Sequence, residues 1–197
     1  MSNKILITII GLPGTGKTTM ANKLSIAMAG IPVISTDIVK AIYRSTGHEV
    51  LGLTSHTAWQ LFGECTDDNI IKGFELQAEI LYRYSLNISE SLFKTYNTVV
   101  VEGLGIDLKK YNELRNYKKI LIYLKNSRID IAYKNKLQYR NDKNNNWYAH
   151  QSVLKVIDSY IQNKISYIDG AVITIDVADS YKIEQLIKEI NAVKIQG

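Results

Sequence analysis

The sequence has a single cysteine, Cys65, among its 197 residues, so no disulfide within the chain and no cysteine-based zinc site is possible. No apolar run approaches the roughly 18 residues that a membrane-spanning helix needs. The only two prolines, Pro13 and Pro32, do not belong to a linker-like segment. Because residues 1–4 lead directly into an apolar run, we expect no signal peptide. These absences favour one domain over residues 1–197 and a reducing, cytoplasmic environment.

The chain has fewer acidic than basic residues, and a net positive charge is compatible with a nucleic-acid partner. Lys and Arg number 24 against 19 Asp and Glu, which gives a net charge of +5. The positive residues are spread along the chain, with a local concentration only between Lys125 and Lys143. A nucleic-acid-binding surface needs a basic stripe or patch. The distribution therefore favours a protein that handles small anionic molecules, and it makes nucleic acid an unlikely partner.

A phosphate-binding loop is the strongest motif in the chain. Residues 11–18 fit the pattern G-x-x-x-x-G-K-[ST] without substitution, and they follow the apolar run at 5–10. A strong helix former follows, so the order is strand, glycine-rich turn and helix. Glycines allow the backbone to approach a polyphosphate, and the helix N-terminus favours negative charge. We assign the following residues to ATP binding: Gly11, Pro13, Gly14, Thr15, Gly16, Lys17, Thr18 and Thr19.

In this motif Lys17 can reach the β- and γ-phosphates and act in catalysis, and the Thr18 hydroxyl can hold Mg²⁺. An Asn-Lys-x-Asp element, which guanine-specific switches need, is not found. The nearest segment, at 135–138, lacks the acid and has a helical pattern. A signalling GTPase is therefore disfavoured, although the sequence does not choose between adenine and guanine.

Short apolar runs alternate with helical patterns along the chain. The expected strands are 5–10, 32–35, 98–102, 119–124 and 171–175. The expected helices are 17–29, 37–45, 67–96, 108–117, 127–141, 148–166 and 180–193. Alternation of this kind predicts right-handed βαβ units in an α/β fold with a doubly wound, five-stranded parallel sheet. Ligands of such folds bind across the carboxyl ends of the strands.

Asp37 follows the second expected strand, which places it at the carboxyl edge opposite the phosphate loop. Lys40 and Arg44 follow at i+3 and i+7, on the same helical face. An acid beside two cations can accept a hydroxyl proton while the cations bind an anionic substrate. Asp37 is thus a candidate catalytic base or substrate positioner, and Lys40 and Arg44 are candidate substrate-binding residues. The alternative is a helix-capping Asp beside ordinary surface cations.

Glu102 ends an abruptly terminated apolar run and is followed by Gly103. A carboxylate at this position can hold Mg²⁺ or face the phosphoryl acceptor. We therefore predict that Glu102 is a catalytic residue, a metal ligand and a substrate-binding residue, and that Gly103 is a substrate-binding residue. The alternative is an acid that caps the next turn. His56 is a weaker substrate-binding candidate, because a lone histidine is often structural.

Residues 139–146 are rich in Asn and Lys and interrupt the helical pattern. They are either a surface turn or the tip of a helical lid, at approximately 126–147, that closes over bound phosphates. The lid interpretation makes Arg128 and Arg140 candidate catalytic cations.

These segments together resemble 2-phosphoglycerate kinase and related small-molecule phosphate-loop kinases. The resemblance is carried by residues 11–19, 35–37 with Arg44, 55–59, 73–79 and 100–103, in that order, and it covers much of the first half of the chain. From residue 107 onward only the general pattern matches. The resemblance implies a nucleotide-kinase-like fold and transfer of the ATP γ-phosphoryl group, with Mg²⁺, to the hydroxyl of a small phosphorylated acid such as 2-phosphoglycerate.

Two alternatives stay open at this point. One is a kinase of nucleotides or nucleic-acid 5′ ends, and the other is a non-catalytic ATP-binding regulator. The sequence does not identify the phosphoryl acceptor or the oligomeric state.

Overall fold

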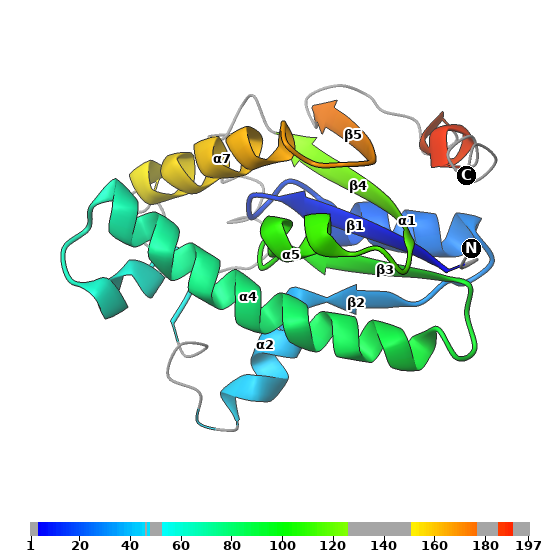
Figure 1. Ribbon diagram of the computed structural model, residues 1–197, viewed down its shortest axis with the longest axis horizontal. Helices are drawn as coiled ribbons and strands as arrows, with labels where there is room; N and C mark the ends of the chain where they lie inside the picture. The colour runs from blue at the N-terminus through cyan, green and yellow to red at the C-terminus, as the bar shows by residue number, and fades with distance from the viewer. Residues whose placement is uncertain (1–3, 46, 48–52, 126–150, 177–184, 191–197) are drawn as a thin grey trace.

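Five parallel strands, in the order β2-β3-β1-β4-β5, form the centre of the protein. They are β1 (Ile5–Gly11), β2 (Val33–Ser35), β3 (Thr98–Gly103), β4 (Lys118–Lys125) and β5 (Ala171–Asp176). The structure, a computed structural model, describes residues 4–45, 47, 53–125, 151–176 and 185–190. In Figure 1 the strands lie one above another with their carboxyl ends pointing left. The predicted α/β fold with a five-stranded parallel sheet is confirmed.

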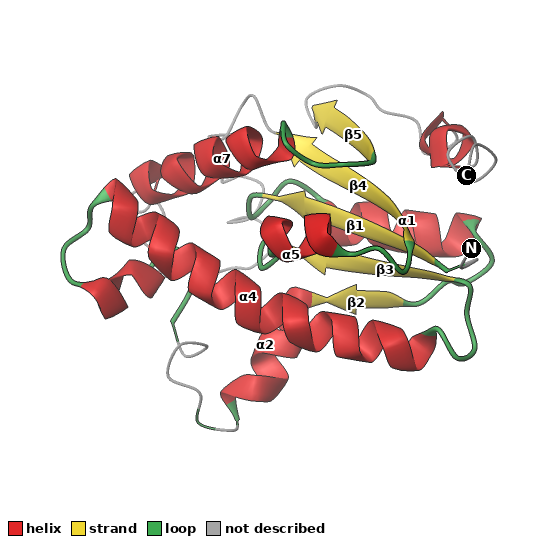
Figure 2. Ribbon diagram, in the orientation of Figure 1, coloured by secondary structure: helices red, strands yellow, loops and turns green. Residues whose placement is uncertain are grey.

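Helices cover both faces of the sheet, which gives three layers (Figure 2). The helices are α1 (Lys17–Ala27), α2 (Thr36–Arg44), α4 (Asp67–Leu92), α5 (Leu108–Glu113) and α7 (Gln151–Ile165), with a short 3-10 helix, η1 (Ala58–Phe62). In Figure 1, α4, α5 and α7 lie in front of the sheet and α1 lies behind it. No helix of the described residues is long and apolar enough to cross a membrane.

Alternate side chains of the central strand β1 enter two separate cores. Leu6 and Ile10 pack with α4, α5 and α7, whereas Ile7 and Ile9 pack with α1 and a helical segment at 185–190. Successive side chains of a strand point to opposite faces, so a strand covered on both faces is apolar throughout. The continuous apolar run in the sequence follows from this double burial.

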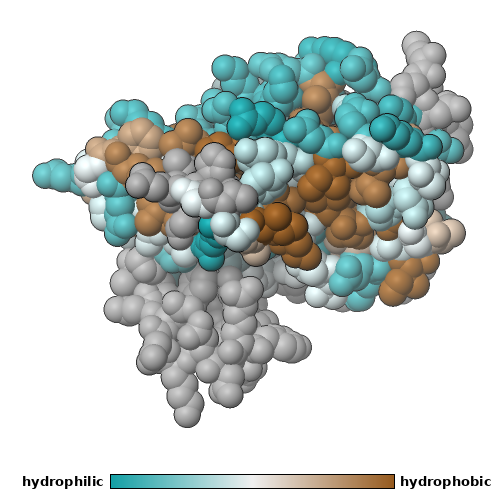
Figure 3. Space-filling view, turned by 90° about the horizontal axis from the view of Figure 1, so that it is seen from below, coloured by the Kyte–Doolittle hydropathy of each residue, from teal (hydrophilic) through white to brown (hydrophobic). Residues whose placement is uncertain are grey.

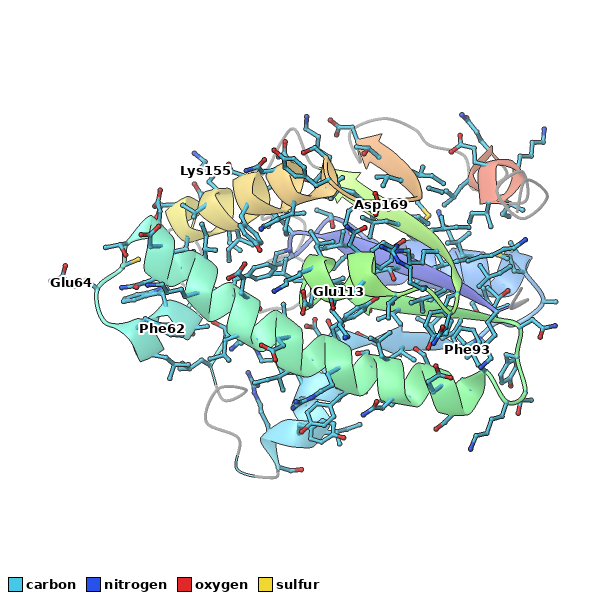
Figure 4. The ribbon with its side chains drawn as sticks, in the orientation of Figure 1. Phe62, Glu64, Phe93, Glu113, Lys155 and Asp169 are labelled. Atoms are coloured by element: carbon cyan, nitrogen blue, oxygen red, sulfur yellow. The ribbon has the colours of Figure 1, made fainter. Side chains whose placement is uncertain are left out.

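The long helix α4 begins with a local capping arrangement. The Thr66 hydroxyl accepts a hydrogen bond from the Asn69 amide at 3.3 Å, and two aspartates occupy the first turn, where they complement the helix dipole. The Asn69 side chain donates to the main-chain oxygens of Phe62 and Glu64 at 3.2 and 3.0 Å. These bonds tie the end of η1 to the start of α4, at the opposite end of the helix from Phe93 (Figure 4).

The predicted strands agree with the observed ones to within one residue at each end. The helix expected at 108–117 is wrong in length, because α5 ends at Glu113 and Leu114 adopts an extended conformation as the chain turns toward β4. The helix η1 was not predicted. The helix expected at 127–141 and the lid expected at 126–147 lie outside the described residues.

Candidate active site

The phosphate loop connects the end of β1 to the start of α1. Gly14 and Gly16 have φ angles of 84° and 82°, in the region that favours glycine. At Gly11 a Cβ atom would lie 2.6 Å from the Leu124 main-chain oxygen, so the close approach of β4 requires glycine. The Thr15 hydroxyl donates to the Leu12 oxygen at 2.9 Å and closes the loop on itself. Pro13 is half-buried within this turn, and Thr19 is exposed in the first turn of α1.

Lys17 lies where the loop meets two acidic residues from other elements. Its Nζ donates to the Leu12 oxygen at 2.8 Å. Burial lowers the pKa of Lys17, and the negative charges of Glu102 and Asp37 oppose this effect. Those two carboxylates therefore lie close enough to Lys17 to act on its charge. β3 and α2 thus meet the phosphate loop at the same edge of the sheet.

Glu102 is buried, with 2% of its surface exposed, and its Oε1 accepts a hydrogen bond from the Thr18 hydroxyl at 3.1 Å. In the sheet Glu102 is paired with Ile9 of β1 and Ser35 of β2. The pairing explains the meeting of Thr18 and Glu102, which are separated by 84 positions, since adjacent parallel strands deliver their carboxyl ends to one edge. A hydroxyl and a carboxylate side by side are hard oxygen ligands of the kind that Mg²⁺ prefers.

Asp37 occupies the first turn of α2, and Ser35 is the N-cap residue. The capping interpretation of Asp37 is therefore wrong in position, although an acid in the first turn still complements the helix dipole. The Asp37 side chain is exposed, and its charge acts on both Lys17 and Lys40.

Gly103 is the point at which β3 and α2 come into contact. Its φ angle is 150°, and a Cβ atom there would lie 1.8 Å from the Thr36 hydroxyl oxygen. Any side chain would push α2 away from the sheet edge. Gly103 thus fixes the position of the helix that carries Asp37, Lys40 and Arg44.

Lys40 is buried, with 8% of its surface exposed, and its Nζ donates to Gln77 Oε1 of α4 at 3.0 Å. Gln77 Oε1 also accepts from the Ser55 hydroxyl at 3.3 Å, and Gln77 Nε2 donates to the Leu53 oxygen at 3.0 Å. The pKa of Lys40 is lowered to about 8, mainly by burial and also by the positive charge of Arg44, while the negative charge of Asp37 opposes the shift. One carboxamide thus joins α2, α4 and the segment 53–55.

Helix α2 has an unusual distribution of polarity. It buries Lys40, whereas Ile38 and Ile42 of the same helix are 63% and 57% exposed. Hydrophobic residues are visible at the surface on the side of the molecule where α2 lies (Figure 3). Burial of an isoleucine stabilises a fold, whereas burial of a cation opposes it. Val39 of α2 is 2% exposed and belongs to the core, so the helix buries one aliphatic side chain and one cation together.

The remaining described candidates lie on the elements that carry Lys40 and Ser55. Arg44 is exposed in the last turn of α2. His56 is half-buried next to Ser55, and its main-chain oxygen accepts from the Trp59 indole at 3.1 Å. Trp59 packs against the core beside Gly73. A Cβ atom at Gly73 would lie 2.6 Å from the main-chain nitrogen of Trp59. Arg128 and Arg140 lie outside the described residues.

Neither Gln77 nor Ser55 was predicted individually as a site residue. The signal for Gln77 was available, because it lies at i+3 from Phe74 and at i−4 from Leu81, both core residues of α4. A polar residue on a buried stripe requires hydrogen-bond partners. Which partners it has depends on tertiary packing.

The sheet order and the loop define the class: the chain has the fold of the P-loop kinases. It is similar to a solved structure from Chloroflexus aurantiacus that is provisionally assigned as a kinase, with a TM-score of 0.60, 17% identity and coverage of 100% of this chain and 99% of that one. It is also similar to shikimate kinase from Acinetobacter baumannii in complex with shikimate, with a TM-score of 0.53, 17% identity and coverage of 97% and 93%. At this identity the two likenesses establish the fold alone.

Among curated proteins the chain is similar to 2-phosphoglycerate kinase of Pyrococcus horikoshii. The two are 32% identical over 107 residues, which are 51% of this chain and 36% of the relative. This match confirms the resemblance seen in the sequence. The matched region spans about a third of the relative's length. No protein-family model matches the chain.

Proposed function

We propose that this protein is an ATP-dependent kinase that transfers the γ-phosphoryl group to the hydroxyl of a small anionic metabolite such as 2-phosphoglycerate. The observation that carries the proposal is the convergence of three elements: the charges of Glu102 and Asp37 both act on Lys17 of the phosphate loop. The fold and the similarity to 2-phosphoglycerate kinase support the same reaction class.

The phosphate loop would hold the ATP phosphates, with Lys17 at the β- and γ-phosphates. Its ammonium would stabilise the negative charge that develops during transfer. Asp37 would accept the proton of the acceptor hydroxyl as that oxygen attacks the γ-phosphorus and the bond to the ADP oxygen breaks. The products are ADP and the phosphorylated acceptor.

Thr18 and Glu102 fit a magnesium site, since their oxygens lie 3.1 Å apart and one of them belongs to a buried carboxylate. Thr18 and Glu102 would hold the ion, which would supply positive charge against the ATP phosphates. A buried acid next to a hydroxyl at the end of the phosphate loop supports this assignment better than a turn-capping role, because Glu102 accepts from a side chain of α1.

Lys40 and Arg44 would bind the acidic groups of the acceptor, with His56 as a weaker candidate. Gly103 would contribute by allowing α2 to pack close to the end of β3. A buried lysine that faces a neutral amide supports this role, because a buried cation is stabilised by an anionic ligand.

The test is an ADP-release screen of the purified protein with Mg-ATP. Acceptors are 2-phosphoglycerate, 3-phosphoglycerate, glycerate and shikimate, together with nucleosides and oligonucleotide 5′ ends. We expect turnover with a small acid and a weak dependence of its KM on salt. A nucleic-acid groove contacts many phosphates and gives a steep log–log salt dependence.

Two outcomes would contradict the proposal. Turnover on oligonucleotide ends with a steep salt slope would establish a nucleic-acid end kinase. ATP binding without turnover on any acceptor would indicate a non-catalytic regulator.

A further inference from the structure

The hydrogen bonding of Lys40 is incomplete for a buried ammonium. An ammonium carries three N–H donors. Among the described residues, Lys40 Nζ has one hydrogen-bond partner, Gln77 Oε1 at 3.0 Å, and it forms no ion pair. Its charge is compensated within the described structure only at longer range, by Asp37. Donor capacity therefore remains for an anion.

The partner of Lys40 is held by a fixed set of bonds. Gln77 is 1% exposed, and its Nε2 donates to the Leu53 oxygen, which requires that the other end of the amide, Oε1, points to Lys40 and Ser55. The carboxamide is neutral, so it orients the ammonium without cancelling its charge. A carboxylate at the same position would form an ion pair with Lys40 and compete with any anionic ligand.

We propose that Gln77 is a positioning residue for acceptor recognition, which holds the Lys40 ammonium so that its remaining N–H donors bind the carboxylate or phosphate of the acceptor. This inference rests on the proposed kinase function. It assigns a role to a residue that lies on α4, outside the phosphate loop and outside α2. It also gives a reason for the burial of Lys40, whose cation enters the interior beside Val39 of the same helix.

The test is the kinetics of Gln77→Glu with the small acid that has the highest kcat/KM in the acceptor screen. Loss of a charge-assisted contact predicts an acceptor KM about 10- to 100-fold higher, with the ATP KM within about twofold of wild type. Asn87→Asp is the matched control. It adds the same charge on the same helix at an exposed position about 15 Å further along, and it should leave both KM values unchanged.

A double-mutant cycle with Lys40→Met separates positioning from general structural damage. If Gln77 acts through Lys40, the Gln77→Glu change should raise the acceptor KM by less than about twofold in the Lys40→Met background. If the acceptor KM of the double mutant instead rises by the product of the two single-mutant factors, the two residues act independently and the inference is wrong. If Gln77→Glu does not fold, Gln77→Met provides the same cycle, because it removes the hydrogen bond without adding charge.

The pH profile supplies a readout that a structural role would not move. In wild type the acceptor KM should rise above pH about 8, where Lys40 loses its proton. Among the described residues, the other charged groups that act on Lys40 are Arg44 and Asp37 of α2, while α4 and the segment 53–55 contribute the neutral Gln77 and Ser55. In Gln77→Glu the added carboxylate favours the ammonium, so the rise should move to higher pH.

The outcomes distinguish this inference from the proposed function. Wild-type turnover with an unchanged acceptor KM in Gln77→Glu would overturn the role of Gln77 and leave the kinase function intact. Absence of wild-type turnover on every acceptor would overturn both.

Discussion

The phosphate loop and the acceptor side of the site are built in opposite ways. In the loop, Thr15 and Lys17 both donate to the oxygen of Leu12, three and five positions away. On the acceptor side, Lys40 meets Gln77, which lies 37 positions further along the chain, and Gln77 meets Leu53 at a separation of 24. One half of the site is a continuous peptide, and the other half exists only when three elements pack together.

This difference bears on function. A contiguous loop binds a phosphate chain that is common to many enzymes, whereas an assembled pocket can change its specificity through single residues on different elements. Variants in the loop should therefore abolish transfer with every acceptor. Variants on the acceptor side should change the acceptor KM and spare ATP. The predictions below test this division in order of decreasing effect.

Lys17→Ala should lower kcat by about 10⁴-fold with all acceptors, because it removes the cation at the phosphates where charge develops. The fold should persist, since the hydrogen bond of Lys17 is to a loop oxygen. ADP release and a thermal melt measure the two effects. Lys23→Ala, an exposed change on the same helix, is the control. Retention of a tenth of the wild-type turnover would rule out this loop as the working site.

Asp37→Asn should lower kcat by about 10³-fold while ATP affinity is kept, because the general base is lost. Steady-state kinetics combined with ATP titration distinguishes the roles. A large rise in acceptor KM at unchanged kcat would identify Asp37 as a substrate positioner instead. The control is Asp68→Asn, in the first turn of α4, where an exposed acid also complements a helix dipole.

Glu102→Gln should raise the Mg²⁺ concentration required for half-maximal activity by about 10-fold or more, because one hard ligand is weakened. The neutral amide can still accept the Thr18 hydroxyl bond, so stability should change little. Activity measured across a Mg²⁺ titration is the readout, with the exposed Glu113→Gln as control. An unchanged Mg²⁺ dependence would remove Glu102 from the metal site.

Arg44→Ala should raise the acceptor KM by about 10-fold and leave the ATP KM within about twofold, because a charge-assisted contact to the acid is lost. Lys94→Ala, which removes an exposed cation just beyond the far end of α4, should change neither value. A parallel rise of both KM values in Arg44→Ala would contradict the division between loop and acceptor side.

Lys40→Met should stabilise the protein at pH 7 by about 1–3 kcal/mol while it weakens acceptor binding. The pKa of Lys40 is about 8 in the fold, below the usual 10.5, so the unfolded chain binds more protons between these values. Below pH about 8 the full penalty of the buried charge is present, and it is relieved as the pH rises toward 10.5. Urea unfolding at pH 7 and pH 10 measures the difference in the free energy of unfolding between Lys40→Met and wild type, and this difference should be smaller at pH 10. A destabilised variant at pH 7 would show that Lys40 supports the fold.

Much of the fold was predictable, because the signals are local. The run at residues 5–10 is apolar on both faces, and the glycines of the loop specify their own backbone angles. The length of α5 was not predictable, since Leu114 leaves the helical conformation where the chain must enter β4. The lid expected at 126–147, with Arg128 and Arg140, lies outside the described residues and stays a prediction.

The phosphate loop, the strand–helix alternation and the placement of Glu102 at the end of one strand and Asp37 just after another follow from the sequence, because each depends on neighbouring residues and on the period of hydrophobicity. Three contacts depend on how distant elements pack. Thr18 meets Glu102, and the Thr36 hydroxyl occupies the space that a Cβ atom of residue 103 would need. Lys40 is buried against Gln77, while Ile38 and Ile42 of the same helix are exposed. A helical pattern indicates which residues share a face, but the direction of that face is set by the elements packed against it. In α2 that packing buries Lys40 beside Val39, so the burial of Lys40 is known from the fold and not from the helical pattern.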